Sequence, residues 1–332
     1  MARILSPTKE NLALCKEALG KSRVIAVPTE TVYGLAGNAL DENSLRSIFK
    51  IKGRPLFNPL IIHSDSLSKA ENYATFNSFA RELAKHFWPG PLTMVLTKKA
   101  IIPDLVTANL NSVGVRCPKN PAFLDLLKIL PYPLAAPSAN PFGYISPTSA
   151  EHVIYSLGDK LEYVLDGGNC KIGIESTIID LRDQTKPKLL RPGPISKEAI
   201  EAIISTKIEK APASLQNDLP APGMLKSHYS PITPLEIRSY NKLKKIAESC
   251  DKIGIAYIFL KRPKILPYQG SNNVYWLSEN GEEFEIARNL YRTLRSLDNL
   301  NYTKIYIEAI DKDCGINVAL QDRLSRASSE EV

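Results

Sequence analysis

Short apolar runs alternate with amphipathic helical patterns over about the first 205 residues. In the first unit, apolar residues recur at helical spacing up to Gly20, a candidate helix C-cap, and a buried strand is expected from Arg23 to Pro28. Further strands are expected at residues 60–63, 94–97, 113–117, 134–137, 163–166, 177–181 and 188–191. This alternation predicts an α/β domain, and open α/β sheets bind ligands at the ends of their strands.

The alternation stops at a proline-rich segment, residues 206–234, which has no periodicity and predicts a semi-extended linker. A second α/β pattern then covers residues 235–332. Its expected strands and helices lie at residues 253–259, 284–294, 304–308 and 318–327, and Phe284 belongs to the expected apolar stripe. We therefore predict a first domain at residues 1–205 and a small Rossmann-like domain at 235–332. The second domain lacks GxGxxG, so no dinucleotide is assigned to it.

Composition narrows the class of protein. The 332 residues are 44% hydrophobic and 23% charged, as in soluble globular proteins, and no apolar run is long enough to span a membrane. We expect a cytoplasmic protein with no membrane association. The five cysteines form no CxxC pair and the four histidines no HxxxH pair, so no protein-bound metal site is expected. The net charge of +7 permits an anionic partner, either a nucleotide or RNA.

Two separate motifs together predict a polyphosphate site. Lys52 and Arg54 lie one residue apart, directly after an expected helix, and Ser138 and Asn140 lie between two prolines after an expected strand. Lys and Arg bind phosphate oxygens, while Ser and Asn donate to them from rigid turns. The alternative is a solvated helix end, because cations favour the C-terminal end of a helix dipole. Taken together, the motifs favour a clamp for a nucleoside triphosphate.

The segment PTETVYGLAG, residues 28–37, follows a buried strand and carries several short donors before its glycines. Thr31 and Tyr33 in this segment fit a pocket for a small polar ligand such as an amino acid. The alternative is an ordinary turn with hydrogen-bonding hydroxyls. Asn58 and His63, which follow the Lys52 motif, are weaker candidates, because a lone histidine at a strand end is more often structural.

Arg116 ends the apolar strand in VGVRCP, where an arginine needs a partner. An internal carboxylate is the structural explanation and a substrate carboxylate the functional one. Ser176 in GIESTIIDL and Arg191 in LLRPGP also lie at strand edges beside glycines and could be turn residues. Together these strand-end groups indicate a ligand that carries both phosphates and a carboxylate.

These residues fall in strings that resemble a known family. The strings are PTETVYGL, KGRP followed by NPL, VGVRCP, APSANPFGYISPT, ESTIIDL, RPG, PGMLKSHYSP and GINVALQDRLSRAS, in this order over nearly the full length. The chain is identified by them as a member of the threonylcarbamoyl-AMP synthases of the YrdC type, in the two-domain version. One departure is Ala221 before Pro222, where the resemblance predicts serine.

The resemblance implies a twisted mixed-sheet YrdC-like catalytic domain and a Rossmann-like C-terminal domain. It also implies a reaction in which L-threonine, bicarbonate and ATP give L-threonylcarbamoyladenylate and pyrophosphate. This product then serves the modification of the tRNA adenosine next to the anticodon by a tRNA threonylcarbamoyltransferase. Magnesium is expected with the ATP, held mainly by phosphates and water, and the protein is expected to be a monomer.

The resemblance also assigns residues. ATP is expected to contact Lys52, Arg54, Asn58, Ser138, Asn140, Ser146, Arg191, His228 and Tyr229. The catalytic set within it is Lys52, Arg54, Ser138 and Asn140. L-Threonine is expected to contact Thr31, Tyr33, His63, Arg116, Ala136 and Ser176. His228 and Tyr229 lie in the linker, which is expected to fold over the site as a lid.

Two alternatives remain open. A basic domain of this kind could bind double-stranded RNA or tRNA without catalysis, by recognising its shape. Carbamoylation in hydrogenase maturation involves related domains, but the missing CxxC zinc pairs argue against it.

Overall fold

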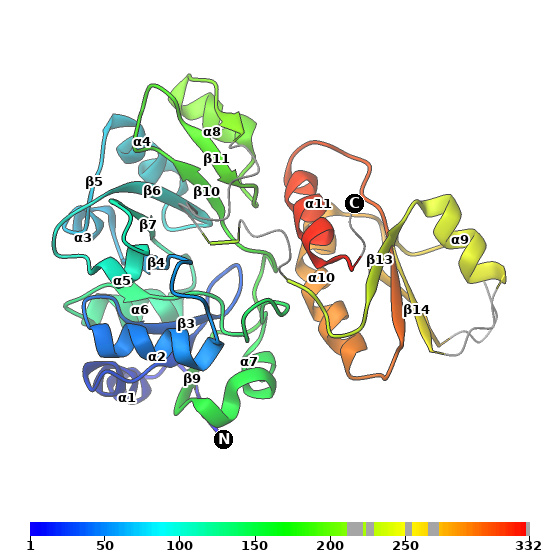
Figure 1. The fold of residues 1–332 in the computed structure, drawn as a ribbon, viewed down its shortest axis with the longest axis horizontal. Helices are drawn as coiled ribbons and strands as arrows, with labels where there is room; N and C mark the ends of the chain where they lie inside the picture. Colours follow the sequence, from blue (N-terminus) through cyan, green and yellow to red (C-terminus); the bar gives the residue numbers. More distant parts are fainter. Residues whose placement is uncertain (211–221, 224–228, 250–253, 265–271, 330–332) are drawn as a thin grey trace.

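The computed structural model describes residues 1–210, 222–223, 229–249, 254–264 and 272–329. The chain forms two α/β domains, each built around its own sheet (Figure 1). Among the described residues, no helix combines the length and apolar character that crossing a membrane requires. His228 and most of the predicted linker lie outside the described residues.

The first domain contains a twelve-stranded mixed sheet in the order β1-β9-β2-β3-β8-β4-β7-β6-β10-β11-β12, with β5 paired to β6. Its strands are β1 (Arg3–Leu5), β2 (Ile25–Val27), β3 (Gly34–Asn38), β4 (Ile61–His63), β5 (Ala74–Thr75), β6 (Leu92–Lys98), β7 (Ser112–Arg116), β8 (Leu134–Ala135), β9 (Tyr163–Leu165), β10 (Thr177–Asp180), β11 (Lys188–Arg191) and β12 (Glu209–Lys210). β4 and β7 are parallel, whereas β6 and β7 are antiparallel. The expected mixed-sheet α/β fold is confirmed.

The helices of this domain cover both faces of the sheet. They are α1 (Lys9–Gly20), α2 (Glu42–Lys52), α3 (Leu67–Ala70), α4 (Ser78–Phe87), α5 (Asp104–Thr107), α6 (Pro121–Ile129), α7 (Ala150–Leu157), the 3-10 turn Gly158–Lys160 and α8 (Lys197–Ile204). The expectation that Gly20 caps α1 was wrong, because Gly20 is still helical and Lys21 is the C-cap.

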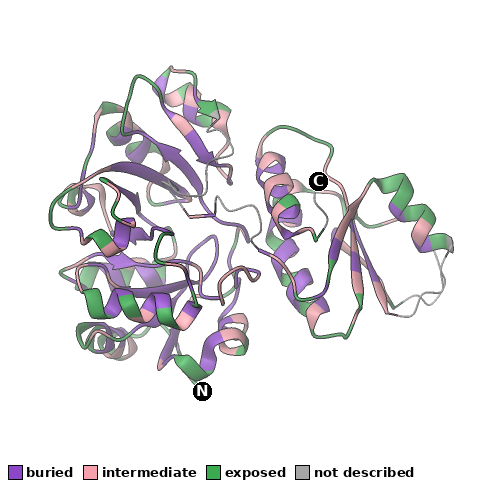
Figure 2. Ribbon diagram, in the orientation of Figure 1, coloured by how far each residue is buried: buried purple, intermediate pink, exposed green. Residues whose placement is uncertain are grey.

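Strand β2 shows how the two cores arise. Its successive side chains point to opposite faces, so Ala26 packs in the cluster of α2 and α4, while Ile25 and Val27 pack in the cluster of α1 and α6. Figure 2 shows that the strands of the first sheet are buried along most of their length. The sheet is therefore the middle layer of three, and only its strand ends and loops are available for a ligand.

The second domain has a four-stranded parallel sheet in the order β13-β16-β14-β15, which confirms the expected Rossmann-like layer. Its elements are β13 (Leu235–Arg238), α9 (Tyr240–Ser249), β14 (Ile255–Lys261), β15 (Val274–Ser278), α10 (Glu283–Asp298), β16 (Lys304–Glu308) and α11 (Ile316–Ala327). Helices α10 and α11 lie between this sheet and the first domain, and α9 covers the opposite face (Figure 1). Phe284 was wrongly placed in the buried stripe of α10: it is exposed, and Ile286 is buried instead.

Candidate active site

A cavity of about 60 Å³ lies where several strands of the first sheet end. The cavity is lined by the ends of β4, β7 and β11, the start of β10, two loops and part of the linker. Its walls are Thr31, Val32, Arg54, Ile61, His63, Arg116, Ala136, Pro137, Ser138, Glu175, Ser176, Arg191, Pro222, Gly223 and Tyr229. Most of the predicted site residues are thus brought together from positions far apart in the sequence.

The two predicted phosphate motifs are in direct contact. Helix α2 ends at Lys52 because Gly53 adopts the left-handed conformation that terminates a helix. The buried Lys52 Nζ donates to the carbonyl oxygens of Ser138 (2.5 Å) and Asn140 (2.6 Å). Burial, with a smaller effect of the Arg54 charge, holds the pKa of Lys52 well below its usual value. An anion beside Lys52 would favour its charged form.

Arg54 is a buried cation that binds only neutral groups in the described part of the chain. Its guanidinium donates to the Asn58 carbonyl (3.1 Å), the Asn58 Oδ1 (2.6 Å) and the Pro59 carbonyl (2.9 Å). Burial, with a smaller contribution from the Arg191 charge, lowers the pKa of Arg54 to about 9. Asn58 therefore lies behind Arg54 instead of lining the cavity, and its Nδ2 has no hydrogen-bond partner among the described residues.

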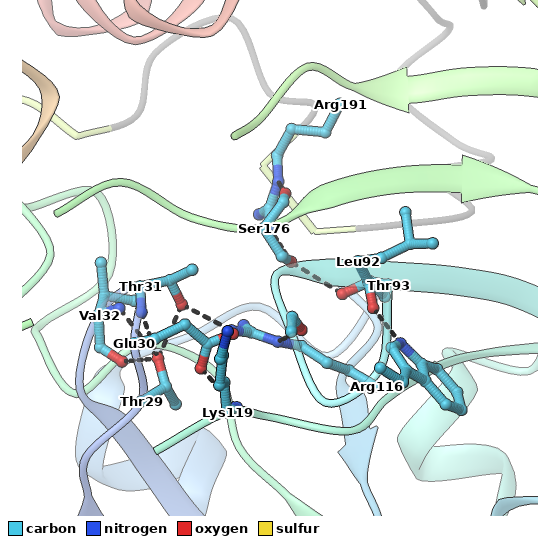
Figure 3. Close-up of polar contacts among 12 residues, drawn as sticks. Thr29, Glu30, Thr31, Val32, Leu92, Thr93, Arg116, Lys119, Ser176 and Arg191 are labelled. Atoms are coloured by element: carbon cyan, nitrogen blue, oxygen red, sulfur yellow. Dashed lines mark hydrogen bonds and ion pairs between the residues drawn. The ribbon is translucent and has the colours of Figure 1, made fainter. Parts of the chain in front are cut away.

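Arg191 connects the start of β10 with the linker. Its Nε donates to the Ser176 carbonyl (3.0 Å), its Nη2 to the Ser176 Oγ (3.0 Å) and its Nη1 to the Pro222 carbonyl (3.4 Å). Ser176 Oγ is also 2.8 Å from Thr93 Oγ1 (Figure 3). Burial lowers the pKa of Arg191, as for Arg54. Two buried guanidinium groups thus face one cavity, an arrangement suited to an anion.

Arg116 has an internal carboxylate partner, as the structural explanation required. Its Nη2 donates to Glu30 Oε1 (2.7 Å) and to Thr31 Oγ1 (3.0 Å), as Figure 3 shows, and Glu30 Oε2 accepts the Lys119 backbone N–H (2.8 Å). Its Nη1 has no hydrogen bond within the described residues, and the side chain lines the cavity. Glu30 therefore fixes Arg116 in place and leaves one guanidinium edge for a ligand.

His63 lines the same part of the cavity as a neutral imidazole. It is 3% exposed, and its Nδ1 has no hydrogen-bond partner among the described residues. Burial, together with the Arg116 charge, lowers the pKa of His63 to about 3. A neutral imidazole in a cavity wall can donate or accept a hydrogen bond from a ligand.

Tyr33, a predicted L-threonine contact, does not line the cavity. Its hydroxyl donates to Asp166 Oδ1 (3.0 Å) and the Gly168 carbonyl (2.8 Å), and it accepts the Gly167 N–H (3.2 Å). The ring is fully buried in the main core. The hydrogen-bond donors in residues 28–37 could be read from the sequence, but the direction in which each side chain points could not.

Three further predicted ATP contacts also lie behind the cavity wall: Lys52, Asn140 and Ser146. Asn140 Nδ2 donates to the carbonyls of Pro141 (2.8 Å) and Tyr144 (2.7 Å), and its Oδ1 has no partner among the described residues. Ser146 Oγ donates to Glu175 Oε1 (2.5 Å). These residues shape the loops around the cavity in the present structure.

Glu175 is the charged wall residue that sequence reasoning missed, although it directly precedes the predicted Ser176. A carboxylate repels phosphate, so a glutamate was not considered as a residue of a phosphate site. Among the described residues, no group of three or more His, Cys, Asp or Glu side chains could hold a metal ion.

Comparisons with known proteins identify the family of this chain. The Sua5_yciO_yrdC family, described as Telomere recombination, matches residues 17–193, and the family described as Threonylcarbamoyl-AMP synthase, C-terminal domain, matches residues 195–329. The chain is 41% identical over 320 residues to the threonylcarbamoyl-AMP synthase of Pyrococcus abyssi, covering 93% of this chain and 91% of that protein.

The corresponding synthase of Bacillus subtilis is 36% identical over 339 residues, covering 99% of this chain and 96% of that protein. The crystal structure of P. abyssi Sua5 complexed with L-threonine superposes with a TM-score of 0.89 at 36% identity and covers 98% of both chains. The chain therefore belongs to the threonylcarbamoyl-AMP synthase family.

Proposed function

We propose that this chain forms L-threonylcarbamoyladenylate and pyrophosphate from L-threonine, bicarbonate and ATP, for threonylcarbamoyladenosine modification of tRNA. The observation that carries the proposal is one cavity walled by three buried arginines, of which Arg54 hydrogen bonds only to neutral groups within the described residues. An uncompensated buried cation is costly, so the cavity is built for an anionic ligand.

The nucleotide is assigned to the side of the cavity that Arg54, Ser138 and Arg191 form. The forked guanidinium groups match phosphate oxygens, and Lys52 holds the loop of Ser138 and Asn140 from behind the cavity wall. Tyr229 closes this side from the linker. These positions follow from the family motifs and from the lining of the cavity together.

L-Threonine is assigned to the side that Thr31, His63 and Arg116 form, with Ala136 and Ser176 as neighbours. The free guanidinium edge of Arg116 suits the threonine carboxylate, because the other edge is already held by Glu30. The hydroxyls and the neutral His63 ring offer hydrogen bonds without adding charge.

In the proposed reaction, the threonine amine adds to carbon dioxide derived from bicarbonate and gives a carbamate. A carbamate oxygen then attacks the α-phosphorus of ATP in line, and the bond to the departing pyrophosphate breaks. The protein's contribution is positioning and charge stabilisation, because no covalent nucleophile is needed. Lys52 and Arg54 are proposed to balance the charge that accumulates on pyrophosphate, with Arg54 in the cavity wall and Lys52 behind it.

Magnesium is proposed to accompany ATP and to neutralise part of the phosphate charge. Among the described lining residues Glu175 is the one carboxylate, and its oxygens already accept hydrogen bonds from Ser146, Tyr291 and Arg323. This donor set fits an ion held mainly by phosphate and water and not by the protein.

The linker is proposed to act as a lid. Pro222, Gly223 and Tyr229 form part of the wall, and the cavity of about 60 Å³ is far below the roughly 300 Å³ of ordinary ligand sites. For ATP to enter, these residues must move outward. Their return would protect the labile carbamate from water.

RNA binding without catalysis explains the site less well. Lys52, Arg54 and Arg116 are all buried, and Arg54 and Arg116 line a small cavity, whereas binding to an RNA backbone needs cations on an open surface.

The proposal is tested by incubating the protein with ATP, L-threonine and ¹³C-bicarbonate and analysing the products by mass spectrometry. We expect a threonylcarbamoyl adenylate that carries the label and forms only when all three substrates are present. A labelled product without threonine, or no adenylate from folded protein, would reject the proposal.

A further inference from the structure

The second domain reaches the wall of the cavity through Glu175. The Glu175 carboxylate accepts three hydrogen bonds: Oε1 from Ser146, and Oε2 from Tyr291 Oη (3.1 Å) and Arg323 Nε (2.8 Å). Tyr291 lies on α10 and Arg323 on α11. Two of the three donors that hold this wall residue therefore come from the other domain.

Arg323 is an unusual residue for a C-terminal helix. It is 0% exposed and is the largest fully buried side chain among the described residues. Besides Glu175, it contacts Asp322 and donates to the Pro192 carbonyl (3.1 Å), directly after Arg191. A buried arginine is retained only where its charge is compensated, so this position is built around Glu175 and Asp322.

Tyr291 and Arg323 also pack against Tyr229. The Tyr229 ring stacks on Tyr291 with centroids 6.0 Å apart and planes at 25°, and the Arg323 guanidinium lies 5.1 Å from the Tyr229 ring centre. Tyr229 and Glu175 both line the cavity. Arg323 and Tyr291 thus support two neighbouring parts of the wall.

The negative charge of Glu175 affects how well a triphosphate can bind in the cavity. Burial alone would raise the pKa of Glu175, but the Arg323 and Arg191 charges outweigh burial, and the pKa lies below its usual value. The carboxylate is therefore ionised on the nucleotide side of the cavity, next to Arg191. Left without Arg323, its negative charge would oppose the phosphates and compete with them for Arg191.

We propose that Arg323, with Tyr291, is a positioning residue for ATP: the second domain neutralises Glu175 and directs it away from the phosphates. The second domain therefore helps to set the affinity of the first domain for its nucleotide. This inference rests on the proposed synthase function.

Two matched pairs of variants test the inference in the full-length protein. Tyr291→Phe removes a hydroxyl that donates to Glu175, and its control Tyr144→Phe removes one that donates across the same interface to Asp298 (2.8 Å). Arg323→Gln removes the charge next to Glu175. Its control is Arg295→Gln, which removes another buried arginine of the second domain, one that binds first-domain carbonyls and Ser156.

The readouts are kcat and the separate KM values for ATP and L-threonine in pyrophosphate release. We expect the KM for ATP to rise about 5-fold in Tyr291→Phe and about 100-fold in Arg323→Gln, with the KM for L-threonine within about threefold of wild type. Arg323→Lys should recover part of the affinity. The two controls should leave the ratio of the two KM values unchanged.

Adding Glu175→Gln to Arg323→Gln should lower the KM for ATP again, because the unpaired negative charge is gone. This double variant and Tyr291→Phe decide the question if Arg323→Gln alone does not fold. An unchanged KM for ATP in Tyr291→Phe, or equal rises in test and control variants, would overturn the inference. Wild-type protein that releases no pyrophosphate would instead reject the synthase function itself.

Discussion

At the scale of single residues, the sequence predicted which residue types form the site better than it predicted where each side chain points. Arg54, Arg116 and Arg191 were expected to meet at strand ends, and they line one cavity. Their partners could not be predicted, since Glu30 and Glu175 come from loops whose path depends on the whole sheet. Tyr33 illustrates the limit, because a side chain on a turn can point either to the ligand or to the core.

Tyr33→Phe tests the structural role of that hydroxyl. The change removes a donor to the half-buried Asp166 and to the carbonyl of the exposed Gly168. We expect the free energy of unfolding in urea to fall by about 0.5–1.5 kcal/mol, with kcat and both KM values close to wild type. A loss of activity above tenfold at unchanged stability would return Tyr33 to the ligand site.

His63 predicts a specific dependence of stability on pH. Its pKa is about 3 in the folded state and has an ordinary value of 6.5, so the unfolded chain takes up a proton first as the pH falls. Burying the neutral ring costs no protonation energy above about pH 6.5. Below that pH the free energy of unfolding therefore falls progressively until about pH 3. Between pH 7 and pH 5 the wild type should lose about 2 kcal/mol more than His63→Asn. Parallel stability curves for the two proteins would contradict this.

At the scale of elements, strands with a strong apolar sequence pattern could be predicted. Strands whose residues are determined by close tertiary contacts could not. The expected strands near β4, β6, β7 and β10 are present. β3 was missed because its sequence, GLAGN, has no β-branched residue. Its glycines are required by tertiary contacts: a Cβ on Gly34 would lie 3.2 Å from Ala136 Cβ, and one on Gly37 would lie 2.4 Å from Ser44 Oγ.

Gly173 makes a comparable contact between the domains. Its φ is +89°, and a Cβ there would lie 2.5 Å from Arg288 Cα and 2.6 Å from the Ala287 carbonyl, both in α10. Gly173→Ala should therefore push α10 away and lower the unfolding free energy by at least about 2 kcal/mol. Gly168→Ala is the control, with a similar φ of +75° but open space around it. Equal losses in both variants, measured in urea, would show that backbone strain alone is responsible.

At the scale of the whole molecule, the two domains meet in one buried hydrophobic cluster. Val32, Ile145 and Ile174 of the first domain pack in the same buried cluster as α10 and α11. The sequence divided the chain at the proline-rich segment but could not show this contact, because Arg323 in α11 resembles an ordinary surface arginine. β12 also pairs with β11, so the first sheet continues a few residues beyond residue 205.

The lid predicts that opening the cavity uncouples the reaction. Tyr229→Ala should raise ATP consumption relative to adenylate formation, because water gains access to the carbamate. Tyr155→Ala, which removes a tyrosine that is 68% exposed on α7, is the control. A ratio of ATP consumed to product formed that stays at the wild-type value in Tyr229→Ala would contradict the lid.

The most direct test of the central claim is pyrophosphate release from ATP, with and without L-threonine and bicarbonate, in wild type, Lys52→Ala and Lys50→Ala. Lys52 joins the two phosphate motifs, whereas Lys50 is exposed on the same helix. We predict release that requires all three substrates, falls at least about 100-fold in Lys52→Ala and is preserved in Lys50→Ala. Release that ignores threonine, or that survives in folded Lys52→Ala, would contradict the account.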